Sequence, residues 1–225
     1  MLHIKCFVFN EFGERCTVAW NDSLEAVIVD PGCRTPQERD ALTGFIRSQG
    51  LRPVRIVLTH AHFDHIYGVA YLSSIYGICT SLNAKDRVIL ENNGVFCSRF
   101  GMPLPEEFAS EDLREGDVIT FGSGENVSRW EVLETPGHTP GGVCLLDRQE
   151  RILFSGDTLF AGSIGRTDNP WGDYDALMEG IFGKLMTLDG DITVIPGHGD
   201  QTTIADERMK NPFLQPFNEP FEEDA

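Results

Sequence analysis

Five of the six histidines in this sequence fall in three short polar turns. His60, His62 and His65 share the first turn, and His138 and His198 each follow a Pro-Gly pair in the other two. Helix and sheet packing give no reason to gather histidines in turns. A metal site, in contrast, needs several unprotonated imidazoles and carboxylates that converge from different loops. The pattern therefore predicts a metal centre.

Two carboxylates complete this predicted centre. In an extended turn alternate residues point the same way, so His60, His62 and Asp64 can face one side while His65 enters from the next helix. Asp157 follows another apolar strand, and its carboxylate can bridge two cations. A structural histidine or a turn aspartate would explain any one of these turns alone. Taken together they predict seven ligands: His60, His62, Asp64, His65, His138, Asp157 and His198.

Hydrolysis is the chemistry that such a centre favours. Two divalent cations, two carboxylates and one bridging hydroxide leave a net charge of about +1, which can stabilise an oxyanion. Metal coordination also lowers the pKa of water from about 15.7 to roughly 7, so hydroxide forms without a strong base. Asp64 and Asp157 are the expected catalytic carboxylates. We expect two divalent metal ions, zinc first, with iron or manganese as alternatives.

The segments around these turns predict the elements that position them. Alternating strands at 4–9, 16–20 and 26–29 indicate a meander, and Thr35 and Glu38 form a capping box for a helix over 36–49. A buried strand at 54–58 leads into the first histidine turn. Helices are expected over 66–76, 84–92 and 175–188, and an irregular excursion near the site over 93–116. Further strands are expected at 118–121, 129–134, 143–146, 152–154 and 192–195. This order predicts an α/β fold with two mixed sheets packed face to face and helices outside.

Composition limits the classes of function. A chain of 225 residues with 41% hydrophobic and 24% charged residues predicts one globular domain over 1–225. The net charge of -17 disfavours nucleic acid as a partner, and part of it lies in an acidic tail, 218–225, expected to be frayed. No stretch approaches the ~20 apolar residues that would span a membrane. The start of the chain is typical of a strand and not of a signal peptide. The six cysteines form no paired motif, which predicts reduced, mostly buried thiols. Together these features predict a cytoplasmic protein.

The motif His60-x-His62-x-Asp64-His65, followed by His138, Asp157 and His198, resembles the metallo-β-lactamase superfamily over nearly the whole chain. Segments 156–160, 165–168 and 211–213 are similar to short glyoxalase II-like, or hydroxyacylglutathione hydrolase-like, thioesterases. The resemblance implies an αββα sandwich. It also implies one metal on His60, His62 and His138, a second on Asp64, His65 and His198, and Asp157 between them.

The sequence also departs from relatives in this family. Full-length glyoxalase II enzymes carry a C-terminal helical domain whose basic residues hold glutathione, whereas this sequence ends soon after His198. The resemblance therefore assigns no glutathione-binding residues to this sequence. The commonest β-lactamases have a cysteine ligand where Asp157 stands, so penicillin-type substrates are not expected.

The resulting hypothesis is a thioesterase whose small-molecule substrate is similar to S-lactoylglutathione. A metal-bridging hydroxide would attack the thioester carbonyl, and a thiolate with a pKa of about 8.5 is a good leaving group. Arg166 and Asp168 either brace the Asp157 loop from behind or form a surface ion pair. The sequence indicates neither the acyl group nor the oligomeric state.

Three alternatives remain at this point. Persulfide dioxygenases of the same superfamily use a single iron, on positions that match His60, His138 and Asp157. A hydrolase of another ester or a lactone would use the same metals. A metal-binding protein without turnover is the alternative outside enzymes.

Overall fold

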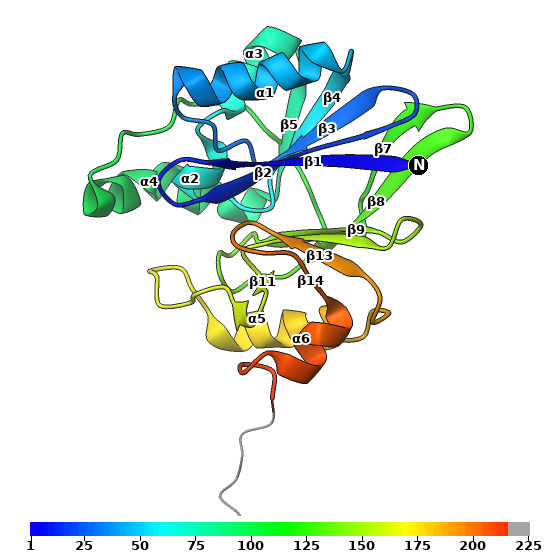
Figure 1. Cartoon of the computed structure of the whole chain (residues 1–225). Coiled ribbons are helices and arrows are strands. Elements are labelled where there is room, and N and C mark those ends of the chain that lie inside the picture. Colours follow the sequence, from blue (N-terminus) through cyan, green and yellow to red (C-terminus); the bar gives the residue numbers. More distant parts are fainter. Residues whose placement is uncertain (216–225) are drawn as a thin grey trace, which may run out of the picture.

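Two six-stranded sheets form the centre of this computed structural model, in which residues 1–215 are described (Figure 1). From edge to edge the first sheet contains β1 (Leu2–Phe9), β2 (Glu14–Asn21), β3 (Glu25–Val29), β4 (Arg52–Val57), β5 (Cys79–Leu82) and β6 (Glu111–Asp112). The second contains β14 (Thr202–Thr203), β13 (Thr193–Pro196), β10 (Ile152–Gly156), β9 (Val143–Asp147), β8 (Asn126–Glu134) and β7 (Val118–Ser123). β11 (Leu159–Phe160) and β12 (Ser163–Ile164) form a small separate ribbon. The predicted frayed tail, 218–225, lies outside the described residues.

Both large sheets are mixed. In the first, β1 to β3 pair antiparallel, whereas β3 to β6 pair parallel. In the second, only β10 and β13 pair parallel. Parallel neighbours need a crossover connection, which explains why helices separate these strands in the sequence.

Helices cover the outer faces of the sheets (Figure 1). α1 (Pro36–Ser48) and α3 (Val69–Tyr76) lie over the first sheet, and α5 (Tyr174–Gly180) and α6 (Ile204–Lys210) lie over the second. The remaining helices are α2 (Phe63–Ile66), the 3-10 turn η1 (Ala84–Asp86), α4 (Arg87–Phe100) and the π-helical η2 (Ile181–Leu185). The order of layers is the expected αββα sandwich.

Three apolar cores hold these layers together. The middle core joins the inner faces of the two sheets, for example Val27 and Val57 of the first with Trp130 and Phe154 of the second. A second core packs α1, α3 and α4 against the first sheet, and a third packs α5 and α6 against the second. Burial of each large side chain contributes roughly 1.5–3 kcal/mol. A sheet that is buried on both faces gives its strands the continuous apolar runs seen in the sequence.

The capping signal for α1 is confirmed. The side chain of Thr35 accepts from the backbone N–H of Glu38, and the carboxylate of Glu38 accepts from the backbone N–H of Thr35. Pro36 occupies the first turn, where a missing N–H costs nothing. The six cysteines are free thiols, and four of them are buried, as expected. Within residues 1–215 we find no helix of the length and apolarity that crossing a membrane requires.

Three helix boundaries differ from the prediction. The helix expected over 66–76 is interrupted at Tyr67 and Gly68, where the chain passes close to a neighbouring loop. A Cβ at Gly68 would collide with Sγ of Cys33 and lie 2.7 Å from the carbonyl oxygen of Pro31. Tight packing, which the sequence pattern does not report, therefore breaks the helix.

The other two differences concern helix ends. α4 continues to Phe100, so residues 93–100 of the expected irregular excursion are helical. Its last turns bury Phe96 and Cys97, and this burial outweighs the low helix propensity of the Asn-Asn-Gly run before them. The helix expected over 175–188 is α-helical only to Gly180 and then changes to a π-helical turn.

The strand ends explain why distant turns meet. β4, β10 and β13 each end within three residues of a predicted ligand: His60, Asp157 and His198, respectively. The loop between β8 and β9 carries His138. The backbone N–H of Val143 donates to the carbonyl oxygen of Thr59 at 2.9 Å, which joins this loop to the first histidine turn.

Candidate metal centre

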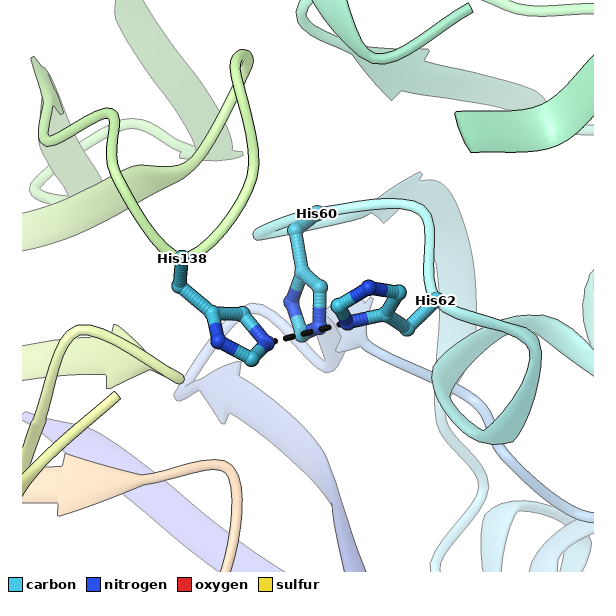
Figure 2. A group of neighbouring side chains, drawn as sticks. All are labelled: His60, His62 and His138. Atoms are coloured by element: carbon cyan, nitrogen blue, oxygen red, sulfur yellow. Dashed lines mark hydrogen bonds between the residues drawn. The ribbon is translucent and has the colours of Figure 1, made fainter. Parts of the chain in front are cut away.

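Three buried histidines form the first group of predicted ligands. His60 and His62 come from the turn after β4, and His138 comes from the β8–β9 loop. Figure 2 shows their rings pointing toward one another. One nitrogen from each ring lies within 4.8 Å of the others, and Nε2 of His138 is 2.9 Å from Nδ1 of His62. The structure therefore brings together the set assigned to the first metal.

The second group contains Asp64, His65 and His198, whose ligand atoms also lie within 4.8 Å of one another. Nε2 of His65 is 3.1 Å from Nε2 of His198. Oδ2 of Asp64 is 3.4 Å from Nε2 of His198 and 3.7 Å from Nε2 of His65. These are the residues assigned to the second metal.

Asp157 lies between the two groups. Its Oδ2 is 3.5 Å from Nε2 of His138 in the first group and 3.6 Å from Nε2 of His198 in the second. Its Oδ1 is 3.5 Å from Nε2 of His65. One carboxylate thus reaches nitrogens of both groups, as the bridging assignment requires.

The unpaired polar atoms of the site fit metal ions. Nε2 of His60, Nε2 of His62 and Oδ1 of Asp157 are buried without a hydrogen-bond partner among residues 1–215. Buried polar atoms are almost always satisfied, and leaving one unpaired costs about 1–3 kcal/mol. A set of imidazole nitrogens and carboxylate oxygens suits zinc, iron or manganese. The residues present therefore fit divalent cations.

Electrostatics within the first group favour metal binding. Burial lowers the pKa of His60 and His62 well below the usual value, and neighbouring histidines lower them further. The pKa of His138 is also lowered, chiefly by burial. Neutral imidazoles keep the lone pair that a metal ion needs.

The second group is surrounded by carboxylates. Burial acts to lower the pKa of His65, but the carboxylates of Asp157 and Asp64 and the hydrogen bond to Asp30 raise it well above the usual value. His65 in turn holds the pKa of Asp64 well below its usual range, against the effect of burial. This group concentrates negative charge where a cation would lie.

Backbone and side-chain acceptors orient the rings. Nδ1–H of His138 donates to the carbonyl oxygen of Arg166 at 2.8 Å, and Nδ1–H of His198 donates to the carbonyl oxygen of Phe12 at 3.1 Å. Nδ1 of His65 lies 3.2 Å from Oδ2 of Asp30. Such partners fix the tautomer and leave the opposite nitrogen, Nε2, free to bind a metal.

Asp30, which directly follows the strand predicted at 26–29, was not predicted as a site residue. Asp30 is 1% exposed and accepts hydrogen bonds from the backbone N–H and the hydroxyl of Thr59 as well as facing His65. β3 pairs parallel with β4, so Asp30 ends its strand beside the start of the first histidine turn. An acidic residue directly after a predicted apolar strand was the signal that could have identified it.

Asp86 was also missed. Its buried carboxylate accepts from the backbone N–H of Ala61 at 2.8 Å, the hydroxyl of Thr139 at 2.9 Å and the backbone N–H of Gly141 at 2.5 Å. Ala61 lies between His60 and His62, whereas Thr139 and Gly141 follow His138. One carboxylate thus holds together the two loops that carry the first group.

Arg166 and Asp168 pair with each other at the surface. Two hydrogen bonds of 2.7 and 3.0 Å join their side chains, which are 54% and 73% exposed. The side chains form the surface ion pair that was one of the two alternatives. Arg166 acts on the centre through its backbone carbonyl, which orients His138.

A cleft of about 130 Å³ opens onto the centre. The predicted ligands His62, Asp64, His138 and Asp157 form part of its lining. The remaining wall consists of four aromatic rings, two arginines and one amide: Phe12, Phe63, Phe96, Phe100, Arg99, Arg166 and Asn169. Part of the segment expected near the site therefore contributes to it, through the last turns of α4.

Comparison with known proteins gives the family. The sequence profile described as "Metallo-beta-lactamase superfamily" matches residues 10–198, which include all seven predicted ligands. The chain belongs to the metallo-β-lactamase superfamily. In this member the second group of predicted ligands is assembled as completely as the first.

Individual relatives within the superfamily give a more specific comparison than the family profile. The chain is 36% identical to hydroxyacylglutathione hydrolase GloC of Haemophilus influenzae, over 95% of this chain and 98% of that protein. Among solved structures it is similar to the BLEG-1 B3 metallo-beta-lactamase, with a TM-score of 0.85, 37% identity and coverage of 95% and 100%. It is also similar to TTHA1623 in a di-iron-bound form, with a TM-score of 0.83, 33% identity and coverage of 93% and 100%. These similarities support a metal-dependent hydrolase.

Proposed function

We propose that this metallo-β-lactamase superfamily member is a binuclear hydrolase that cleaves thioesters, with S-lactoylglutathione or a close analogue as substrate. The observation that carries the proposal is the position of Asp157, whose Oδ2 lies 3.5 Å from His138 and 3.6 Å from His198. A carboxylate within reach of both groups is what a two-metal site needs. A single-metal site would leave the second group without a role.

The proposed ligands follow the two groups. His60, His62 and His138 would hold one ion, and Asp64, His65 and His198 the other. Asp157 would contact both. We propose zinc as the native metal, with iron or manganese as alternatives, since nitrogen and oxygen ligands accept all three.

Metal ions bound here would supply hydroxide at neutral pH and polarise the substrate carbonyl. The residues of the chain provide the surroundings for that chemistry. Asp64 and Asp157 contribute the negative charge that balances the cations. The orienting acceptors Asp30, Thr59 and the Arg166 carbonyl keep the imidazoles in place, so little reorganisation is needed during the reaction.

The cleft fits a thioester better than a strongly hydrated substrate. The rings of Phe12, Phe63, Phe96 and Phe100 give one side of the cleft an apolar surface. A thiolate of ordinary pKa, about 8.5, leaves without a general acid near neutral pH. Among residues 1–215, the cleft contains no histidine other than the predicted ligands His62 and His138 that could serve as such an acid. The similarity to GloC supports this choice of substrate class.

The single-iron dioxygenase alternative has less support. It would use His60, His138 and Asp157 and leave Asp64, His65 and His198 without a function. Those three residues nevertheless converge, and His65 and His198 each have an orienting partner. We therefore do not propose oxygen chemistry for this centre.

We propose that the protein works in the cytoplasm on a small-molecule substrate. The free thiols of all six cysteines are typical of a reducing compartment. A net charge of -17 disfavours nucleic acid as a partner.

Hydrolysis assays with a defined metal content test the proposal. Zinc-loaded protein should hydrolyse S-lactoylglutathione, lose the activity with a chelator and regain it when zinc is added. A simple lactone and benzylpenicillin serve as comparison substrates for the other hydrolase classes. If either comparison substrate is hydrolysed faster than every thioester tried, the thioesterase proposal is wrong.

A further inference from the structure

Four aromatic rings, those of Phe12, Phe63, Phe96 and Phe100, line the cleft beside the candidate metal centre. The ring of Phe12 lies 5.1 Å from that of Phe63 and 5.3 Å from that of Phe100, both edge to face. Phe96 lies 5.7 Å from Trp171. Such a wall provides apolar contact for a substrate chain but cannot select its orientation, because aromatic surfaces offer few directional contacts.

Two guanidinium groups, those of Arg99 and Arg166, line the same cleft. The guanidinium of Arg166 already donates two hydrogen bonds to the carboxylate of Asp168. Arg99 stands in the last turn of α4, where its guanidinium lies 5.9 Å from the ring centroid of Phe100. Within residues 1–215 Arg99 forms neither a hydrogen bond nor an ion pair, so its five donors are available to a ligand.

The negative net charge of the molecule makes a cation at the position of Arg99 important for binding an anionic substrate. A net charge of -17 repels an anionic substrate at a distance. The other charged groups that line the cleft are the proposed ligands Asp64 and Asp157, which bound metal ions would balance, and Arg166, which Asp168 balances. Arg99 is therefore the cleft-lining cation within residues 1–215 that has no carboxylate in ion-pair contact, although its charge also acts on Asp168 from farther away.

We propose that Arg99 determines specificity by binding a carboxylate at the end of the thioester substrate, while the chain between that carboxylate and the thioester packs on Phe96 and Phe100. The planar fork of a guanidinium matches the two oxygens of a carboxylate. This inference rests on the proposed thioesterase function. It assigns carboxylate recognition to α4, within the metallo-β-lactamase domain itself.

A matched pair of substrates tests this assignment. The acetyl thioester of 3-mercaptopropionate carries a carboxylate, and the acetyl thioester of methyl 3-mercaptopropionate lacks the charge. The quantity measured is the ratio of kcat/KM for the acid to kcat/KM for the methyl ester. In Arg99→Gln we expect this ratio to fall about ten-fold or more, mainly through a higher KM for the acid, because a hydrogen bond to a charged group contributes about 1.5–3 kcal/mol.

Two further variants serve as controls. Arg87 begins the same helix, is exposed and does not line the cleft, so Arg87→Gln makes the same change in net charge elsewhere. We expect Arg87→Gln to keep the wild-type ratio and Arg99→Lys to restore it in part. A ratio that is the same in Arg99→Gln and in wild type, or that falls equally in Arg87→Gln, overturns the assignment. If wild-type protein loaded with metal hydrolyses S-lactoylglutathione but neither acetyl thioester, the assignment of Arg99 is overturned. If it hydrolyses none of the three, the proposed function itself is wrong.

Discussion

Oδ2 of Asp30 lies 3.2 Å from Nδ1 of His65, and both side chains are buried. Nε2 on the opposite side of the same ring is 3.1 Å from Nε2 of His198. The carboxylate therefore favours the tautomer of His65 that presents a free Nε2 to the second group. This contact connects the end of β3 to the chemistry of the centre.

Asp30→Asn should weaken the second metal more than the first. The amide keeps the size of the side chain but removes the charge that supports His65, and changes of this kind typically cost about 10–100-fold in metal affinity. Competition with a chromophoric chelator measures both affinities. Asp22→Asn is the control, since Asp22 is exposed and pairs with the N-terminus. Equal loss at both metals would argue that Asp30 acts only on stability.

Asp157→Ala should remove the second metal and most of the activity. Asp157 is the proposed shared ligand, so its loss should lower kcat by about a hundred-fold or more, beyond the effect typical of an orienting partner. Metal content per chain and kcat on the same sample check this. Full turnover by the variant would rule out the bridging role.

Gly197→Ala should disturb the centre with little effect on the rest of the fold. A Cβ at Gly197 would collide with Oδ1 of Asp157 and lie 2.8 Å from Cε1 of His65. We expect a lower metal content and a loss of stability of about 1–3 kcal/mol, typical of overpacking. Gly183→Ala is the matched control because, apart from its chain neighbours and the backbone of its own helix, no atom lies within 4 Å of its Cβ position. Wild-type metal content in Gly197→Ala would show that the carboxylate can move without consequence.

Asp86 should make the stability of the metal-free protein depend on pH. Burial raises the pKa of Asp86 to about 6, although its three hydrogen bonds act to lower it. An unfolded aspartate has a pKa of about 3.9, so between these values the folded state holds the proton more tightly. The contribution of Asp86 is therefore most favourable at low pH and is lost as pH rises through about 6.

Denaturant unfolding of wild type and Asp86→Asn from pH 4 to pH 7 measures this contribution. Asparagine does not titrate, so the free energy of unfolding of wild type minus that of the variant should fall by roughly 2 kcal/mol over the range. The contributions of the other titrating groups, which both proteins share, cancel in this difference. Parallel curves for the two proteins would mean that the pKa of Asp86 is not raised in the folded state.

The seven candidate ligands could be predicted because each lies in, or directly after, a short polar segment that follows an apolar strand, and both features are local in the sequence. The partners behind them could not. The role of Asp30 depends on the pairing of β3 with β4, and that of Asp86 depends on two loops more than fifty residues apart. Helix boundaries were missed for a related reason, since burial of Phe96 extends α4 and close packing at Gly68 interrupts a helix.

Metal content and thioester hydrolysis, measured on one batch of protein expressed without added metal, test the central claim most directly. The account predicts two divalent ions per chain and hydrolysis of S-lactoylglutathione that follows the metal content on removal and reloading. One iron per chain, with oxygen uptake on glutathione persulfide and no thioester hydrolysis, would contradict it.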